Sequence, residues 1–310
     1  MMEPLQKWFE DQRDFQKLIF GFNPDELSVD EKRRLTKEYL LHMVSEVDEI
    51  LDAMGMWKTH RRGLKYPNKE AIAEELVDVM KFVINIALTW KITPEELDEK
   101  FRQKTIINRI IYGQDAVLEK LRNRPVAVFD VDGTLNDYPE KFVEYVNFTL
   151  GRNFTFGDYL LLPRKLPYTQ YEELKARFRE SRYGSVEFLP EVKEVFTALK
   201  KNGVGIVLLT GRPHEVFKTS LYETYMKLTR GGIPFDCIVH SREKGLRIIK
   251  DFENVLFAVE DEPEWAVDIC KYGIKTYLVE KPYNRTFVTD FPVIRVKSLR
   301  EVLTREGVFS

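Results

Sequence analysis

The sequence predicts two domains: an all-α helical bundle followed by a doubly wound α/β domain that carries a small helical cap. Up to residue 113 the apolar residues recur at helical spacing, whereas after residue 125 short apolar runs alternate with helical segments. That alternation is typical of a parallel sheet with helices on both faces. A chain of 310 residues is long enough for two cores. We therefore expect a helical domain over residues 1–113, a linker over 114–124 and an α/β domain over 125–310.

Four helices account for the first domain. Capping boxes begin two of them, because Ser28 is followed by Glu31, and Thr93 by Glu96, at the spacing that lets each hydroxyl bond the backbone of the third helical residue. Short connections between helices favour a bundle. The expected helices cover residues 3–20, 28–56, 69–90 and 93–112.

Six apolar runs predict the strands of the second domain. The first, Val126–Phe129, is typical of a strand that is buried on both faces of a parallel sheet. The other runs are 205–209, 237–239, 255–259, 276–279 and 293–296, and the helical segments are 190–201, 214–228, 243–251, 263–272 and 298–304. Residues 137–190 have helical and aromatic character without a strand, so we expect them to form a cap over the site.

Composition limits the kinds of partner. A net charge of −2 gives no reason to expect a nucleic-acid or membrane surface. Cys237 and Cys270 form no disulfide framework, no apolar run could span a bilayer, and the start has no signal-peptide pattern, so we expect a cytoplasmic protein. The sequence lacks the glycine motifs of P-loop and dinucleotide-binding proteins, and its histidines lack zinc spacing.

Two aspartates follow the first strand directly. Asp130 and Asp132 leave the carboxyl end of the sheet, where open α/β sheets place their chemistry. Two carboxylates that converge repel each other unless a cation lies between them, and Mg²⁺ is the usual one for oxygen ligands. A carboxylate can also attack phosphorus, while a second one donates and accepts protons. Later segments supply Thr210, Lys244, Glu260 and Asp261.

This ordered set resembles the motifs of the haloacid dehalogenase superfamily, over residues 125–305. The resemblance implies a Rossmann-like fold in which Asp130 is the nucleophile and Asp132 the general acid and base. It also implies that Thr210 and Lys244 stabilise the phosphate. An aspartate at position 132 is similar to the phosphatase branch of the superfamily.

The same resemblance implies a Mg²⁺ site. Its ligands would be Asp130, the main-chain carbonyl of Asp132, and Asp261. Glu260 stands where the commoner form of the acidic motif has glycine, and we count it as a further candidate ligand.

Two narrower similarities concern the substrate of the second domain. Leu278–Arg285, with segments 293–296 and 299–303, looks like the tail of the deoxyribonucleotide 5′-nucleotidases. The run Thr210-Gly211-Arg212 also fits the polynucleotide 3′-phosphatases, which stay open as the alternative, as does a phosphatase for small molecules in general. Arg212 is a candidate substrate-binding residue.

Two pairs of carboxylates lie among apolar residues of the first domain. Glu46 and Glu49 are three apart on the second helix, and Glu75 and Asp78 are three apart on the third. Residues at that spacing share a helix face. A carboxylate pair on an inward face is costly unless something positive holds it, so antiparallel packing of the two helices would bring four carboxylates to a Mg²⁺ site.

This pattern resembles the all-α nucleoside triphosphate pyrophosphohydrolases, and Glu49–Lys58 looks more narrowly like the dimeric dUTPases. The resemblance covers residues 5–113 and implies metal binding by the four carboxylates, with Glu49 also catalytic. It implies substrate contacts from Gln12, which would read the base, and from Trp57, Lys58, Lys104 and Asn108. The residues after position 58 depart from the family's aromatic pattern, so dCTP stays open beside dUTP. A bundle that accepts many triphosphates stays open as the alternative.

Together the two resemblances predict a bifunctional nucleotide hydrolase. In the first domain, water activated by Mg²⁺ would attack the α-phosphorus of a pyrimidine dNTP and release pyrophosphate, and the second domain would dephosphorylate a nucleoside monophosphate. Because related bundles complete their sites by pairing, we expect a homodimer or higher oligomer through residues 1–112. The alternative of another class is a regulatory protein that senses dNTPs without turnover.

Overall fold

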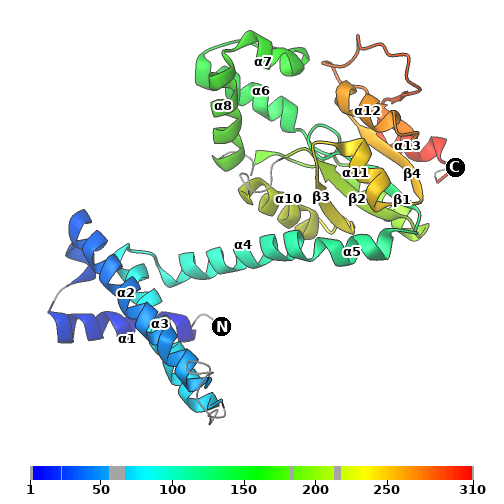
Figure 1. Ribbon diagram of the computed structural model, residues 1–310. Helices are drawn as coiled ribbons and strands as arrows, with labels where there is room; N and C mark the ends of the chain where they lie inside the picture. Colours follow the sequence, from blue (N-terminus) through cyan, green and yellow to red (C-terminus); the bar gives the residue numbers. More distant parts are fainter. Residues whose placement is uncertain (1–2, 22, 56–66, 182–184, 213–217, 309–310) are drawn as a thin grey trace. The chain divides into compact units, whose positions relative to one another are not determined.

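The structure is a computed structural model that describes residues 3–21, 23–55, 67–181, 185–212 and 218–308 (Figure 1). The chain divides into two compact units, Met1–Lys104 and Thr105–Ser310. The division falls inside helix α4 (Pro94–Tyr112), earlier than the boundary predicted at residue 113. The reason is that Ile106, Ile110 and Ile111, in the last turns of α4, join the core of the second unit. Within the described ranges, no helix is both long and apolar enough to cross a membrane.

The first unit is helical. Besides α4, it contains α1 (Glu3–Phe15), a π-helical turn (Gln16–Phe20), a 3₁₀ turn (Pro24–Glu26), α2 (Val29–Ala53) and α3 (Lys69–Thr89). Both predicted capping boxes form: Glu31 N donates to Ser28 Oγ, and Glu96 N donates to Thr93 Oγ1. The side chain of Asn68 caps α3, a role that the sequence analysis did not assign.

Helices α2 and α3 form an antiparallel pair. At one end Asn68 N donates to the carbonyl of Ala53, and at the other Trp90 Nε1 donates to Thr36 Oγ1 at 2.8 Å. The buried core of this unit is small and centres on Phe9, Ile84, Ala87 and Leu88. The apolar residues expected to surround the carboxylates on inward faces are instead exposed within one chain, among them Leu40, Leu41, Val44, Val47, Leu76, Val77, Met80 and Val83.

The second unit is built on one parallel sheet of six strands. Helix α5 (Gln114–Leu121) occupies most of the predicted linker and leads into the first strand. The strands are β1 (Val126–Phe129), β2 (Gly205–Thr210), β3 (Cys237–His240), β4 (Val255–Glu260), β5 (Thr276–Val279) and β6 (Ile294–Val296). Their order, β3-β2-β1-β4-β5-β6, is that of a doubly wound sheet whose direction of winding reverses between β1 and β4.

Helices cover both faces of this sheet. Ala127 and Phe129 of β1 lie in the core that α9 (Val192–Lys201), α10 (Lys218–Arg230) and α13 (Leu299–Arg305) share with the sheet. Val126 and Val128 lie in the core on the other side, with α5, α11 (Lys244–Asp251) and α12 (Pro263–Cys270). Burial on both faces explains why β1 is continuously apolar.

The predicted cap is helical. It contains α6 (Tyr138–Leu150), a 3₁₀ turn (Phe156–Leu161), α7 (Leu162–Lys165) and α8 (Tyr168–Ser181), and it has its own aromatic core, which includes Phe142 and Phe178. Its two connections to the sheet are joined, because Asn136 pairs with Phe188 and Glu187 N donates to Asp137 Oδ1. The cap therefore begins and ends at one place beside β1.

Candidate active site

A pocket of about 420 Å³ lies at the carboxyl ends of the central strands. Asp130 follows β1, Thr210 ends β2 and Glu260 ends β4, and all three line the pocket. Because β1 and β4 are the neighbouring strands at which the winding reverses, this is the crevice where open α/β sheets bind their ligands.

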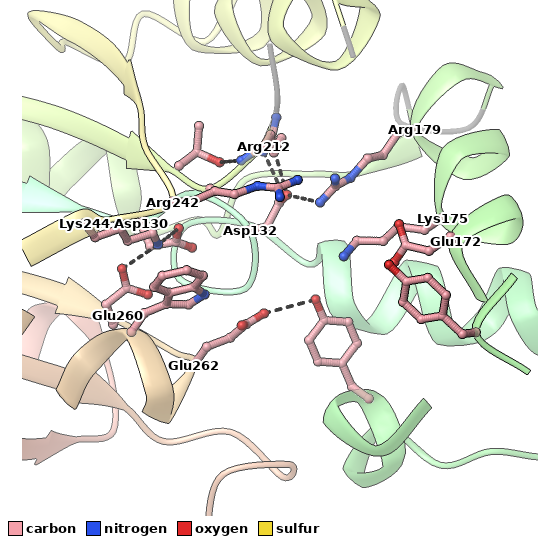
Figure 2. Close-up of a pocket in the computed structure, with 15 residues that line it drawn as sticks. Asp130, Asp132, Glu172, Lys175, Arg179, Arg212, Arg242, Lys244, Glu260 and Glu262 are labelled. Atoms are coloured by element: carbon pink, nitrogen blue, oxygen red, sulfur yellow. Dashed lines mark hydrogen bonds and ion pairs between the residues drawn. The ribbon is translucent and has the colours of Figure 1, made fainter. Parts of the chain in front are cut away.

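Lys244 holds two carboxylates at the floor of this pocket (Figure 2). As predicted, it begins a helix, and its Nζ lies 2.6 Å from Asp130 Oδ1 and 2.6 Å from Glu260 Oε1. Although burial lowers the pKa of Lys244, the carboxylates of Asp130 and Glu260 keep it above its ordinary value. Two nearby cations, Arg242 and Lys250, are exposed, and of these Arg242 lines the pocket.

Three buried carboxylates can share a cation here. Asp130, Glu260 and Asp261 each offer an oxygen, and these oxygens lie within 4.8 Å of one another. Burial raises the pKa of all three carboxyl groups, and that of Glu260 and Asp261 well above the ordinary value. Glu260 Oε2 is buried with no hydrogen-bond partner among the described residues. Hard oxygen donors with surplus negative charge are the donor set that Mg²⁺ prefers, so these residues fit the metal implied by the sequence.

Asp132 does not belong to this group of three carboxylates and is instead paired with arginine. Arg212 Nε and Nη2 donate to its Oδ2 and Oδ1 at 2.7 and 2.6 Å, and Arg179 Nη2 lies 3.8 Å from Oδ2. The guanidinium of Arg212 also donates to Thr224 Oγ1 at 3.0 Å. A bidentate pair of this kind fixes the direction of the carboxylate. The predicted substrate contact Arg212 therefore lines the pocket and orients the proposed general acid.

In the first unit, three of the four predicted carboxylates come together. Oxygens of Glu46, Glu75 and Asp78 lie within 4.8 Å of one another, and all three side chains are partly exposed. Glu49 is close enough to raise the pKa of Glu75, after the larger effect of burial, and it raises the pKa of Glu46 in the same way. Asp78 accepts a hydrogen bond from Lys81 at 2.8 Å. Repulsion among oxygen ligands again fits a site for a divalent cation.

A hollow of about 600 Å³ adjoins this cluster. It is lined by Gln12, the predicted base-reading residue, and by Glu46 and Asp78 of the cluster. The other predicted contacts are not gathered there: Lys104 is exposed at the end of the first unit, and Asn108 is exposed in the second. Trp57 and Lys58 lie outside the described residues.

Comparison with known proteins places a dUTPase similarity over the first unit and the beginning of the second. A family model described as dUTPase matches residues 4–149, just under half of the chain. A nucleotidase from Clostridium acetobutylicum is 26% identical over 164 residues, which are 50% of this chain and 80% of that protein. The first unit lies almost wholly within the match to the dUTPase model and is called the dUTPase-like module, and the doubly wound second unit is called the hydrolase module. We use these names for the first and second units from here on.

Solved structures are similar as well. A haloacid dehalogenase superfamily hydrolase from Ehrlichia chaffeensis is 14% identical with a TM-score of 0.37, and the match covers 61% of this chain and 97% of that chain. A phosphatase of the same superfamily from Thermococcus onnurineus is 16% identical with a TM-score of 0.37, covering 59% of this chain and 98% of that chain.

The hydrolase module also brings residues to the pocket that the sequence analysis missed. Tyr168, Glu172, Lys175 and Arg179 line it from α8, and Figure 2 shows Lys175 and Arg179 directed toward the aspartates. Their spacing of four, three and four residues places them on one helix face, and this spacing is the sequence signal that could have predicted them. Burial lowers the pKa of Lys175. The cap thus brings two basic side chains, Lys175 and Arg179, to the pocket that Asp130 and Asp132 line.

Proposed function

We propose that the chain is a bifunctional nucleotide hydrolase that uses Mg²⁺ in both modules. The dUTPase-like module would hydrolyse a pyrimidine dNTP, dUTP in preference to dCTP, to the monophosphate and pyrophosphate. The hydrolase module would remove phosphate from a (deoxy)nucleoside monophosphate. The observation that carries the proposal is the meeting of Asp130, Glu260 and Asp261 at the reversal point of the sheet, where Lys244 contacts the first two of them.

In the hydrolase module, Asp130 is the proposed nucleophile. Lys244 neutralises one of its oxygens, and the other forms a bond to phosphorus as the ester bond breaks, giving an aspartyl-phosphate. Asp132, oriented by Arg212, gives its proton to the leaving oxygen. It then takes a proton from the water that attacks the aspartyl-phosphate, which releases phosphate and restores Asp130. Mg²⁺ held by the three clustered carboxylates would supply further positive charge to the phosphate.

The dUTPase-like module offers a surface for a base beside its carboxylates. The rings of His42 and Phe82 stack with centroids 5.8 Å apart, and both residues line the hollow together with Gln12 and Asn85. An amide side chain both donates and accepts hydrogen bonds, as the edge of a pyrimidine requires. Mg²⁺ held by Glu46, Glu75 and Asp78, with Glu49 beside them, would neutralise the triphosphate and activate water.

Fusion of the two modules supports a sequential reaction. The monophosphate that leaves the first site has the chemistry of the substrate proposed for the second. Net conversion of a dNTP to its nucleoside would remove that nucleotide from the DNA-precursor pool irreversibly.

The test feeds dUTP and Mg²⁺ to the full chain and follows pyrophosphate, dUMP, deoxyuridine and phosphate. We expect the wild type to form deoxyuridine, Asp130→Asn to stop at dUMP, and Glu75→Ala to release no pyrophosphate. Binding of dUTP without turnover would support the sensor alternative instead. Should the wild type leave dUMP intact yet dephosphorylate a 3′-phosphorylated oligonucleotide, the sequential reaction is wrong and the polynucleotide alternative holds.

We also propose that the dUTPase-like module pairs with a second copy. Apolar side chains along α2 and α3 are exposed in one chain, including Leu41 at 63%, Val44 at 66% and Val77 at 49%. Contiguous apolar surface on a helix pair is typical of a contact between subunits. Light scattering is expected to give at least twice the mass of one chain, and the mass of a single chain would count against the pairing.

A further inference from the structure

Two neighbouring acids after β4 are each held by a tyrosine. The hydroxyl of Tyr283 donates to Asp261 Oδ2, and the hydroxyl of Tyr159 donates to Glu262 Oε1 at 3.4 Å. Tyr283 belongs to the segment after β5, whereas Tyr159 belongs to the 3₁₀ turn of the cap. The two rings are in contact, with centroids 5.1 Å apart, and Phe156 of the cap lies 5.3 Å from the ring of Tyr283.

The carboxylate of Asp261 is fixed from two sides. Besides Tyr283, Thr134 Oγ1 donates to its other oxygen at 2.9 Å, and the residue is fully buried. Space around it is also closed, because a Cβ added to Gly133 would lie 2.2 Å from Asp261 Oδ2 and 2.8 Å from the Tyr283 hydroxyl. With one hydrogen bond on each oxygen, the carboxylate has one orientation available.

The segment that carries Tyr283 is itself anchored. Asn284 Nδ2 donates to the carbonyls of Asp261 and Val279, both at 2.8 Å, and its Oδ1 accepts from Lys281 N at 3.0 Å. Arg295 donates to the carbonyl of Asn284 at 2.8 Å. This explains why a Pro-Tyr-Asn run far along the chain from Asp130 matters to the site: it is fastened to the end of β5 and to the acid itself.

We propose that Tyr283 is a positioning residue that holds Asp261 in the orientation needed to bind the metal, and that its ring contacts tie this orientation to the cap. The inference rests on the proposed metal-dependent phosphatase function. Asp261 is a member of the carboxylate cluster, and hydrogen bonds to a ligating carboxylate are the usual way in which a protein fixes it before the metal arrives. In this role Tyr283 acts through Asp261 and need not contact the phosphate.

The test replaces Tyr283 with Phe in the full chain, which removes the hydroxyl and keeps the ring contacts. Binding of Mg²⁺ is measured by calorimetry, and Asp261→Asn serves as the blank that separates this site from the carboxylates of the dUTPase-like module. We expect Tyr283→Phe to weaken Mg²⁺ binding at this site by about tenfold, the usual scale for loss of a hydrogen bond to a metal ligand. The Mg²⁺ concentration for half-maximal hydrolysis of p-nitrophenyl phosphate should rise equally, with KM at saturating Mg²⁺ unchanged.

Tyr277→Phe is the matched control, because Tyr277, which is buried where Tyr283 is partly buried, likewise donates to a carboxylate, Glu306, in the same module. It should bind Mg²⁺ like the wild type. The role of Tyr283 is overturned if Tyr283→Phe binds Mg²⁺ as tightly as the wild type, or if Tyr277→Phe weakens binding as much. A wild type that binds no more Mg²⁺ than Asp261→Asn would overturn the metal site itself, a different result from failure of Tyr283 alone.

Discussion

The two carboxylate clusters of this chain differ in what surrounds them. In the hydrolase module the clustered acids are buried, and an equally buried lysine, Lys244, is in contact with two of them. In the dUTPase-like module the clustered acids are partly exposed, and the ion pair formed among the described residues joins Asp78 to Lys81, which is itself half-exposed.

This difference reflects the elements that carry the acids. Strand ends of a parallel sheet converge at one edge, so a single chain can enclose its acids and place a cation among them. Acids on the faces of two helices stay open to solvent until another surface covers them. The cluster of the hydrolase module is therefore complete within one chain, whereas we infer that the cluster of the dUTPase-like module is completed by the second copy proposed above. Three variants test this contrast.

Removal of the built-in lysine should have the largest effect. In Lys244→Met the carboxylates of Asp130 and Glu260 lose their shared cation while they remain buried. Leaving one side of a buried ion pair unpaired costs about 3–5 kcal/mol, so we expect the free energy of unfolding in urea to fall by about that amount. Added Mg²⁺ should restore part of it, and phosphatase activity should be lost.

Lys250→Met is the matched control for this loss of charge. Lys250 lies on the same helix, α11, and is exposed. We expect its stability to equal that of the wild type. Equal destabilisation by the two variants would mean that Lys244 acts through the helix and not through the carboxylates.

A charge on the exposed apolar face of α2 should separate the two activities. Val44→Lys would place an ammonium in the proposed contact between copies, and an unpaired buried charge costs several kcal/mol. We expect pyrophosphate release from dUTP to fall by about a hundredfold at chain concentrations where the wild type is paired. Hydrolysis of p-nitrophenyl phosphate should be unchanged, since the phosphatase cluster is complete in one chain.

The matched control is Val288→Lys, which places the same charge on an exposed valine of the hydrolase module. It should keep both activities and the wild-type mass in light scattering. If Val44→Lys remains paired and still loses pyrophosphate release, the site depends on α2 in some other way. If it becomes a single chain and keeps that activity, the contrast between the clusters fails.

The fold could be predicted because its signals are local. Each strand of the parallel sheet is a short apolar run with turn residues beside it, and the predicted strands end within one residue of β2, β3 and β4. Strand ends in turn specify where Asp130, Thr210 and Glu260 lie, because they must share one edge of the sheet. The same local logic found the capping boxes at Ser28 and Thr93.

What could not be predicted depends on contacts between distant segments. Tyr283 reaches Asp261 only through the path of the chain after β5, and Arg212 reaches Asp132 only because β1 and β2 are neighbours. The exposure of Leu41 and Val44 was missed for another reason. Helical spacing places apolar residues on one face but does not say whether that face meets its own chain or another.

The smallest predicted effect concerns the pH dependence of the open cluster. Partial burial raises the pKa of Glu75 above its ordinary value of 4.5, and Glu49, Asp78 and Glu46 raise it further. A raised pKa means that the folded chain prefers the protonated carboxyl, so this contribution to stability is present below the ordinary pKa and is lost as pH rises through the raised value.

In EDTA, the melting temperature should therefore fall more between pH 4.5 and about pH 7 in the wild type than in Glu75→Gln, which cannot ionise. Glu74→Gln removes an exposed charge that contributes less to the raised pKa than Glu49, Asp78 or Glu46, so it should depart from the wild type less than Glu75→Gln does. Mg²⁺ should reverse the order by stabilising only chains that keep Glu75, and identical profiles for the wild type and Glu75→Gln with and without Mg²⁺ would show that these acids neither repel one another nor share a cation.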